Sequence, residues 1–287
     1  MAITVLRPAL TVAAAALLVL GAGIVVNADT TSDDAFAAAG PASTVTSTKT
    51  AATASAASAA PATAAASTST TSAPKPLGAE AAVGALFTNG SHFCSASVVH
   101  SASGDVVLTA AHCVNSGSGA ATRSGLTFAP GYHDGVAPYG MWTVTRAVVA
   151  AGWSASSDPD LDFAFLTVRQ AGTSATVESL TGANTLGVDR GFANRITLTG
   201  YPDTTDAPVV CPGTTSRSDT YQQRVACPGF PDGTSGGPWV TDVDASTGHG
   251  TVVGVIGGYE LGGDTPDVSY SAYFDDDIGN LYASVNG

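Results

Sequence analysis

The chain has 287 residues and a net charge of −13, with 23 acidic against 10 basic side chains. A strongly negative surface repels phosphate backbones, so the composition argues against nucleic acid as a partner. This length accommodates one large domain or two small ones.

The N-terminus carries a candidate export signal. Arg7 precedes an apolar run over residues 9–26, which is typical of a secretory signal peptide, with cleavage after Ala28 or Ala37. The alternative is an uncleaved, outward-facing membrane anchor, because 18 apolar residues almost span a bilayer. We therefore assign residues 1–37 to a signal-peptide region and expect a secreted protein, with membrane contact only if this segment is retained.

Residues 38–76 consist almost wholly of Ala, Ser, Thr, Pro and Gly. Such a segment has little large apolar surface to offset chain entropy, so we expect it to be disordered. It would serve as a linker or as a pro-segment. The composition changes after it, and we expect one folded domain over residues 77–287.

Short runs rich in β-branched and aromatic residues follow, separated by Gly, Asn, Asp and Pro. The predicted strands span residues 82–87, 95–100, 105–108, 142–149, 163–168, 195–199, 239–241 and 251–256. A helical pattern is visible only near the end, at residues 278–285. Many short strands with frequent turns predict an all-β sandwich or barrel.

The four cysteines indicate disulfides, because an even count behind an export signal is typical of an oxidising compartment. Three pairings exist, and we expect the short-range one, Cys94 with Cys113 and Cys211 with Cys227. No Cys-x-x-Cys pair or histidine cluster accompanies them, so we expect neither a metal site nor another cofactor.

The stretch 232–239 (DGTSGGPW) places the hydroxyl of Ser235 among three glycines. A serine nucleophile needs a neighbouring base and N–H donors aimed at the carbonyl oxygen that it attacks. Glycines let a backbone turn tightly enough to present such donors, and we expect the N–H groups of Gly233 and Ser235 to form an oxyanion hole. The alternative is a plain glycine-rich turn.

A candidate base and carboxylate precede this stretch. His112 follows the apolar run 106–108 directly after Thr-Ala-Ala. Three aspartates lie at 158, 160 and 162, and Asp162 opens the apolar sequence Phe-Ala-Phe-Leu. Asp162 and Asp160 are the candidates for the carboxylate that orients His112; Asp158 precedes a proline and is better explained by a turn. The family resemblance described next favours Asp162, because the triad aspartate of that family similarly opens an apolar strand.

Residues 108–113 (LTAAHC) and 233–238 (GTSGGP) together resemble the chymotrypsin/trypsin family of serine proteases, and the resemblance spans about residues 81–282. It implies two six-stranded β-barrels packed side by side, here about 77–175 and 176–287, with a short C-terminal helix. It also implies a triad in the order His112, Asp162, Ser235, which cleaves through an acyl-enzyme.

The chain departs from trypsin at Thr234, where the family usually has an aspartate that pairs with a new N-terminal amine after zymogen cleavage. The start of the domain, residues 82–86 (AVGAL), also lacks the usual terminus. The sequence is more similar to bacterial relatives with the same nucleophile motif, and we expect no amine-dependent activation.

The resemblance implies a substrate pocket built from three segments. Its expected lining is Gly229, Phe230, Gly257, Gly258, Tyr259 and Asp267. Asp267 either receives a basic substrate side chain or points to solvent, which leaves an apolar pocket. A buried carboxylate without a partner is costly, so a buried Asp267 would favour a basic substrate.

The sequence thus predicts a secreted, monomeric serine endopeptidase that acts on polypeptides and is a target for a proteinaceous inhibitor. The alternatives are a catalytically silent binding protein with the same fold and a cell-wall-associated module.

Overall fold

The computed structural model describes residues 81–258 and 265–286. The expected signal region, the Ala/Ser/Thr-rich segment and Tyr259 lie outside these residues. Within the described part of the chain, no helix is long and apolar enough to cross a membrane.

The first half of the described chain is a closed barrel. Its strands follow one another around the barrel in the order β1-β2-β3-β6-β5-β4. They are β1 Val83–Thr88, β2 Ser91–Val98, β3 Val106–Thr109, β4 Thr127–Pro130, β5 Trp142–Val149 and β6 Ala164–Arg169. All neighbouring strands in it are antiparallel.

Side-chain alternation on β3 and β6 gives this barrel two apolar faces. Val107 pairs with Leu166, and both side chains belong to the barrel interior. Val106, Leu108 and Phe165 point the other way and belong to a separate core shared with the second half. These strands are therefore buried on both faces, which explains why each begins with three consecutive apolar residues.

The described residues of the second half form two sheets. The larger has the order β7-β13-β12-β8-β9 and the smaller the order β10-β11-β14. The strands are β7 Thr185–Leu186, β8 Arg195–Gly200, β9 Val209–Thr214, β10 Ser216–Arg217, β11 Gln222–Ala226, β12 Pro238–Thr241, β13 Thr251–Val255 and β14 Val268–Ala272.

One core and one disulfide hold these two sheets together. Leu198, Trp239 and Val253 from the larger sheet pack with Val225 from the smaller one. The bond between Cys211 on β9 and Cys227 after β11 links the sheets covalently. The predicted all-β, chymotrypsin-like class is confirmed: among the described residues the first half is a closed barrel and the second half is two packed sheets.

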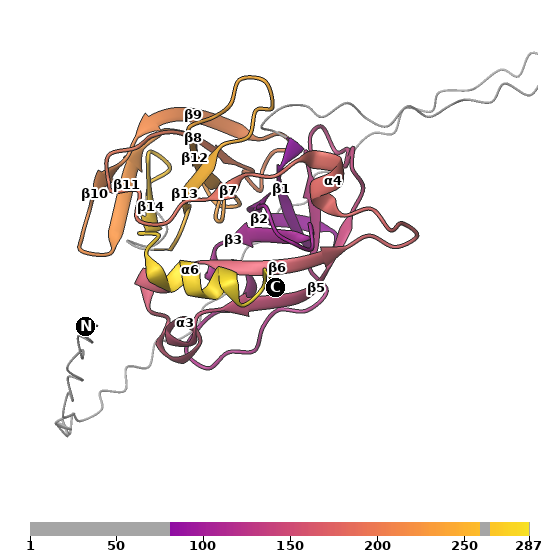
Figure 1. The fold of residues 1–287 in the computed structure, drawn as a ribbon, viewed down its shortest axis with the longest axis horizontal. Helices are drawn as coiled ribbons and strands as arrows, with labels where there is room; N and C mark the ends of the chain where they lie inside the picture. The colour runs from indigo at the N-terminus through magenta and orange to yellow at the C-terminus, as the bar shows by residue number, and fades with distance from the viewer. Residues whose placement is uncertain (1–80, 259–264, 287) are drawn as a thin grey trace, which may run out of the picture. The chain divides into compact units, whose positions relative to one another are not determined.

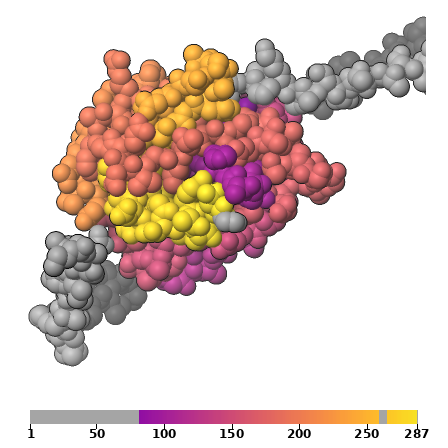
Figure 2. All heavy atoms as spheres, viewed as in Figure 1, coloured from indigo at the N-terminus to yellow at the C-terminus, as the bar shows by residue number. Residues whose placement is uncertain are grey.

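Short helices connect the strands: α2 Ala111–Val114, α3 Ala151–Ser156, the 3-10 turn η1 Pro159–Leu161, α4 Val177–Thr181 and the C-terminal α6 Asp276–Ala283. The side chain of Asp275 caps α6 by accepting a hydrogen bond from Asp277 N. Ile278 and Tyr282 pack against the outer face of the barrel, where the ring of Tyr282 lies 5.5 Å from that of Phe165. Figure 1 shows α6 along β6, and Figure 2 shows the same segment (yellow) on the molecular surface.

Each predicted strand has a counterpart in the structure, and the predicted C-terminal helix is α6. The sequence did not predict β4, β7, β9, β10, β11 or β14. Strand β9 contains Cys-Pro-Gly and β11 begins with two glutamines, so neither shows the apolar alternation of a typical strand.

Candidate active site

A disulfide fixes the position of His112. The residue lies in the one-turn helix α2, directly after β3. Its neighbour Cys113 is bonded to Cys94 on β2, so the turn cannot move away from the barrel. Thr109 Oγ1 also donates to Ser95 O at 2.7 Å and joins the end of β3 to β2. Both expected disulfide pairings are present.

Asp162 lies directly behind this histidine and is only 1% exposed. Its Oδ2 is 2.8 Å from His112 Nδ1, and its Oδ1 accepts a hydrogen bond from His112 N at 2.9 Å. A third donor comes from the second half of the fold, since Gly258 N lies 2.6 Å from Oδ2. The carboxylate is therefore held in one orientation by three N–H groups.

The geometry of the turn η1 gives Asp158, Asp160 and Asp162 different contacts. Asp158 caps the turn by accepting a hydrogen bond from Asp160 N, Pro159 occupies its first position, and Asp162 is its C-cap. The side chain of Asp160 faces Gln222 Nε2 at 2.9 Å. The structure thus brings Asp162, and not Asp160, to His112.

The pair perturbs both pKa values. Burial is the largest influence on His112 and lowers its pKa, but the charge and hydrogen bond of Asp162 outweigh burial and the opposing charge of Arg123. The pKa of His112 is therefore raised above 6.5. Burial raises the pKa of Asp162, yet the His112 charge and hydrogen bonds from His112 and Gly258 bring it below 3.8. Each of the two groups therefore stabilises the charged form of the other.

The loop around Ser235 packs against the same region. Ser95 N donates to Ser235 O at 2.7 Å, and that oxygen lies 3.7 Å from the sulfur of Cys113. Gly236 has φ +81°, and a Cβ atom there would lie 2.2 Å from Thr109 Oγ1, so only glycine is tolerated. The partly exposed Ser235 is thereby placed next to the residue that follows His112.

Three polar groups of this loop have no hydrogen-bond partner among residues 81–258 and 265–286. They are the Ser235 hydroxyl and the backbone N–H groups of Gly233 and Ser235. Gly233 has φ +91°, which turns the backbone sharply before the serine. Catalytic hydrogen bonds are often long or unformed in the free enzyme, so these groups remain available to a substrate.

Thr234 closes this loop internally. It is 1% exposed, and its Oγ1 donates to Pro231 O at 2.6 Å. The loop is therefore held by its own hydroxyl–carbonyl bond at the position where trypsin has a charged aspartate.

The residues expected to line the substrate pocket differ in their burial and in their hydrogen bonds. Phe230 is 4% exposed and packs into the core of the second half, because its neighbours there are apolar. Gly258 donates its N–H to Asp162, and Gly257 N donates to Tyr270 O at 2.8 Å. The two remaining described residues of the expected lining, Gly229 and Asp267, are exposed.

One cluster in this region has the composition of a metal site. Cys94, His112 and Cys113 place three potential metal-ligating atoms within 4.8 Å, but the two sulfurs form a disulfide and are not thiolates.

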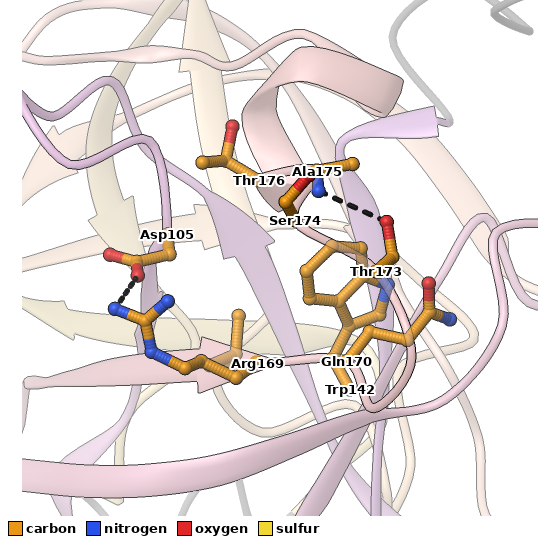
Figure 3. Close-up of a pocket in the computed structure, with 9 residues that line it drawn as sticks. Asp105, Trp142, Arg169, Gln170, Thr173, Ser174, Ala175 and Thr176 are labelled. Atoms are coloured by element: carbon orange, nitrogen blue, oxygen red, sulfur yellow. Dashed lines mark hydrogen bonds and ion pairs between the residues drawn. The ribbon is translucent and has the colours of Figure 1, made fainter.

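A small pocket at one end of the barrel is lined by Trp142 and Thr173 and by the ion pair of Asp105 with Arg169 at 3.3 Å (Figure 3). None of the predicted site residues lines it.

Comparison with solved structures defines the class of protein. The thermostable serine protease AL20 from an extremophilic microorganism has 27% identity and a TM-score of 0.64, over 72% of this chain and 97% of its own. The protease Anisep from Arthrobacter nicotinovorans has 26% identity and a TM-score of 0.63, and the match covers 72% of this chain and 95% of Anisep. A Glu endopeptidase shares the fold at 16% identity, with a TM-score of 0.57 over 72% and 91%. The protein is a serine-type endopeptidase, and its neighbours suggest a bacterial origin.

The family follows from the sequence itself. Residues 90–255, more than half of the chain, match the trypsin-like peptidase domain, and the chain belongs to this family. None of the curated proteins searched matches it.

Proposed function

We propose that Ser235, His112 and Asp162 form a catalytic triad that hydrolyses peptide bonds of polypeptides outside the cell. The observation that carries this proposal is the double contact between Asp162 and His112, through both Nδ1 and the backbone N. A carboxylate accepts at Nδ1, so the ring proton resides there and Nε2 keeps its lone pair.

That lone pair supplies the base. The His112 side chain is 30% exposed, so the ring is accessible from the solvent side. Nε2 takes the proton of the Ser235 hydroxyl as Oγ bonds to the scissile carbonyl carbon, and then gives this proton to the leaving amine. Asp162 stabilises the imidazolium that forms between these steps. A water molecule, deprotonated by His112, then releases the acyl group and restores the serine.

The N–H groups of Gly233 and Ser235 would stabilise the negative oxygen of the tetrahedral intermediate. They have no partners among the described residues and are fixed by a closed loop, so they need no reorganisation when the charge develops.

Action outside the cell is supported by the two disulfides, which persist in oxidising compartments. The apolar segment at residues 9–26 would direct the export.

A fluorophosphonate probe tests the triad. The folded protein should be labelled at Ser235, and Ser235→Ala and His112→Ala should each abolish both labelling and peptide hydrolysis. His100→Ala is the matched control, because His100 also pairs with a carboxylate, Glu178 at 2.6 Å, but is 65% exposed. Labelling that survives in His112→Ala, or folded wild type that is not labelled, would favour the catalytically silent alternative.

A further inference from the structure

One buried glutamine joins the two halves of the fold behind the candidate triad. Gln222 begins β11 in the second half and is fully buried. Its Nε2 donates two hydrogen bonds, to Pro159 O and to Asp160 Oδ1, both at 2.9 Å. Both acceptors belong to the turn η1 of the first half, whose C-cap is Asp162.

The chemistry of this contact requires a nitrogen that donates two protons. A carbonyl and a carboxylate offer only lone pairs, so the nitrogen between them must carry two protons. The other end of the side chain, Gln222 Oε1, is buried and has no partner in the described part of the chain. A buried unpaired acceptor is destabilising, and a methionine of similar shape would avoid that cost. The role of Gln222 therefore lies in its two hydrogen bonds to η1 and not in packing alone.

The position of η1 determines the position of Asp162. The turn has only three residues, so a shift at Pro159 or Asp160 is transmitted directly to the carboxylate that follows. That carboxylate must reach two nitrogens of His112 at once. We propose that Gln222 is a positioning residue, which holds η1 from the second half of the fold and so keeps Asp162 in contact with His112.

A measurable consequence follows for the histidine. Two charged groups act on His112: Asp162 raises its pKa, whereas Arg123 lowers it. When η1 is no longer held, the contact with Asp162 weakens, and burial and Arg123 then dominate. The pKa of His112 falls toward or below 6.5. This consequence does not depend on turnover, although its effect on hydrolysis rests on the proposed function.

Two neighbouring glutamines allow a matched experiment. Gln223, next along β11, is also fully buried, donates one hydrogen bond to Val253 O at 2.6 Å and also has a buried, unpaired Oε1. It makes no hydrogen bond to η1 among the described residues. Gln222→Met and Gln223→Met each delete a buried amide of the same size. The His112 ring would be titrated by NMR in both variants, alongside kcat and KM for a peptide substrate.

We expect Gln222→Met to lower the pKa of His112 and to reduce kcat by about tenfold with KM changed less than twofold, because only the orientation of the base is lost. Gln223→Met should reduce Tm without moving the histidine titration. An unchanged titration in Gln222→Met, or an equal shift in both variants, overturns the proposal. If Gln222→Met does not fold, Asp160→Ala removes one of the two acceptors and should shift the titration in the same direction. If wild type shows no hydrolytic activity but Gln222→Met still lowers the pKa of His112, the positioning role stands and the proposed function is refuted instead.

Discussion

Replacing Asp162 by asparagine tests the site most directly, because its carboxylate accepts three hydrogen bonds. The amide nitrogen of the asparagine must replace either Oδ1, where it meets His112 N–H, or Oδ2, where it meets Gly258 N–H. In each orientation the amide N–H group points at a backbone N–H group. That buried backbone donor is left unpaired, at a cost of about 1–3 kcal/mol in unfolding free energy.

The second orientation also harms catalysis. A nitrogen at the Oδ2 position donates to His112 Nδ1, which moves the ring proton to Nε2 and removes the base. We expect kcat to fall by about 10⁴-fold, the loss known for amidation of the triad carboxylate in the Ser-His-Asp template. Without the Asp162 charge, burial and Arg123 both lower the pKa of His112, so the acid limb of the residual activity should move to lower pH.

The same substitution changes how stability depends on pH. The pKa of Asp162 is lowered from 3.8 in the folded state, so its pairing stabilises the fold above that pH and is lost as the pH falls through the lowered pKa. The pKa of His112 is raised from 6.5, so its contribution is complete below 6.5 and is lost as the pH rises through the raised pKa. The stability advantage of wild type over Asp162→Asn should therefore decline toward both ends of the pH range in urea titrations.

Asp160→Asn is the control, because an asparagine there can still accept from Gln222 through its carbonyl oxygen. It should retain nearly full activity. If Asp160→Asn is the more damaging change, or if the acid limb of Asp162→Asn moves to higher pH, the assignment of the carboxylate is wrong.

Three further predictions concern stability, activation and specificity. Replacing Cys94 and Cys113 together by alanine opens a loop of 19 residues and should cost about 3 kcal/mol of unfolding free energy in urea titrations, with activity reduced in parallel. Because Thr234 closes its own loop, versions of the protein that begin anywhere in residues 38–76 should hydrolyse peptides at equal rates; dependence on one particular N-terminus would contradict this. Asp267→Ser should lower kcat/KM for arginine peptides relative to phenylalanine peptides by about two- to fivefold, since an exposed charge is strongly screened; an arginine preference unaffected by the substitution would refute a basic pocket.

Side-chain patterns were sufficient to locate the main parts of the candidate site. Asp162 could be chosen because it precedes an apolar strand, as the triad aspartate does in the family that the sequence resembles. The disulfide pairing followed from short sequence separations, which are 19 and 16 residues in the structure. The apolar strands β3 and β6 were predictable because both of their faces are buried.

The remaining contacts leave no such signal. Gly258 acts on Asp162 through its backbone N–H, which every residue except proline has, so its role follows only from the folded path of the chain. Gln222 is a polar residue in a strand without apolar alternation, and its partner turn lies 62 residues earlier. Phe230 was expected in the pocket because the resemblance builds the pocket partly from the segment before the nucleophile, but the side chain packs into the core between the two sheets.

The packing of α6 against the barrel also determines when the molecule can finish folding. Tyr282 donates to His100 O, and Ala102 N donates to Asn286 Oδ1, across 182 and 184 residues of sequence. Contacts of such range make folding slow. At about 5–20 residues per second, Tyr282 is synthesised on the order of ten seconds after Phe165, the ring that it covers. The outer face of the barrel around Phe165 therefore stays uncovered until α6 has been synthesised, so the barrel cannot complete its core before the helix arrives.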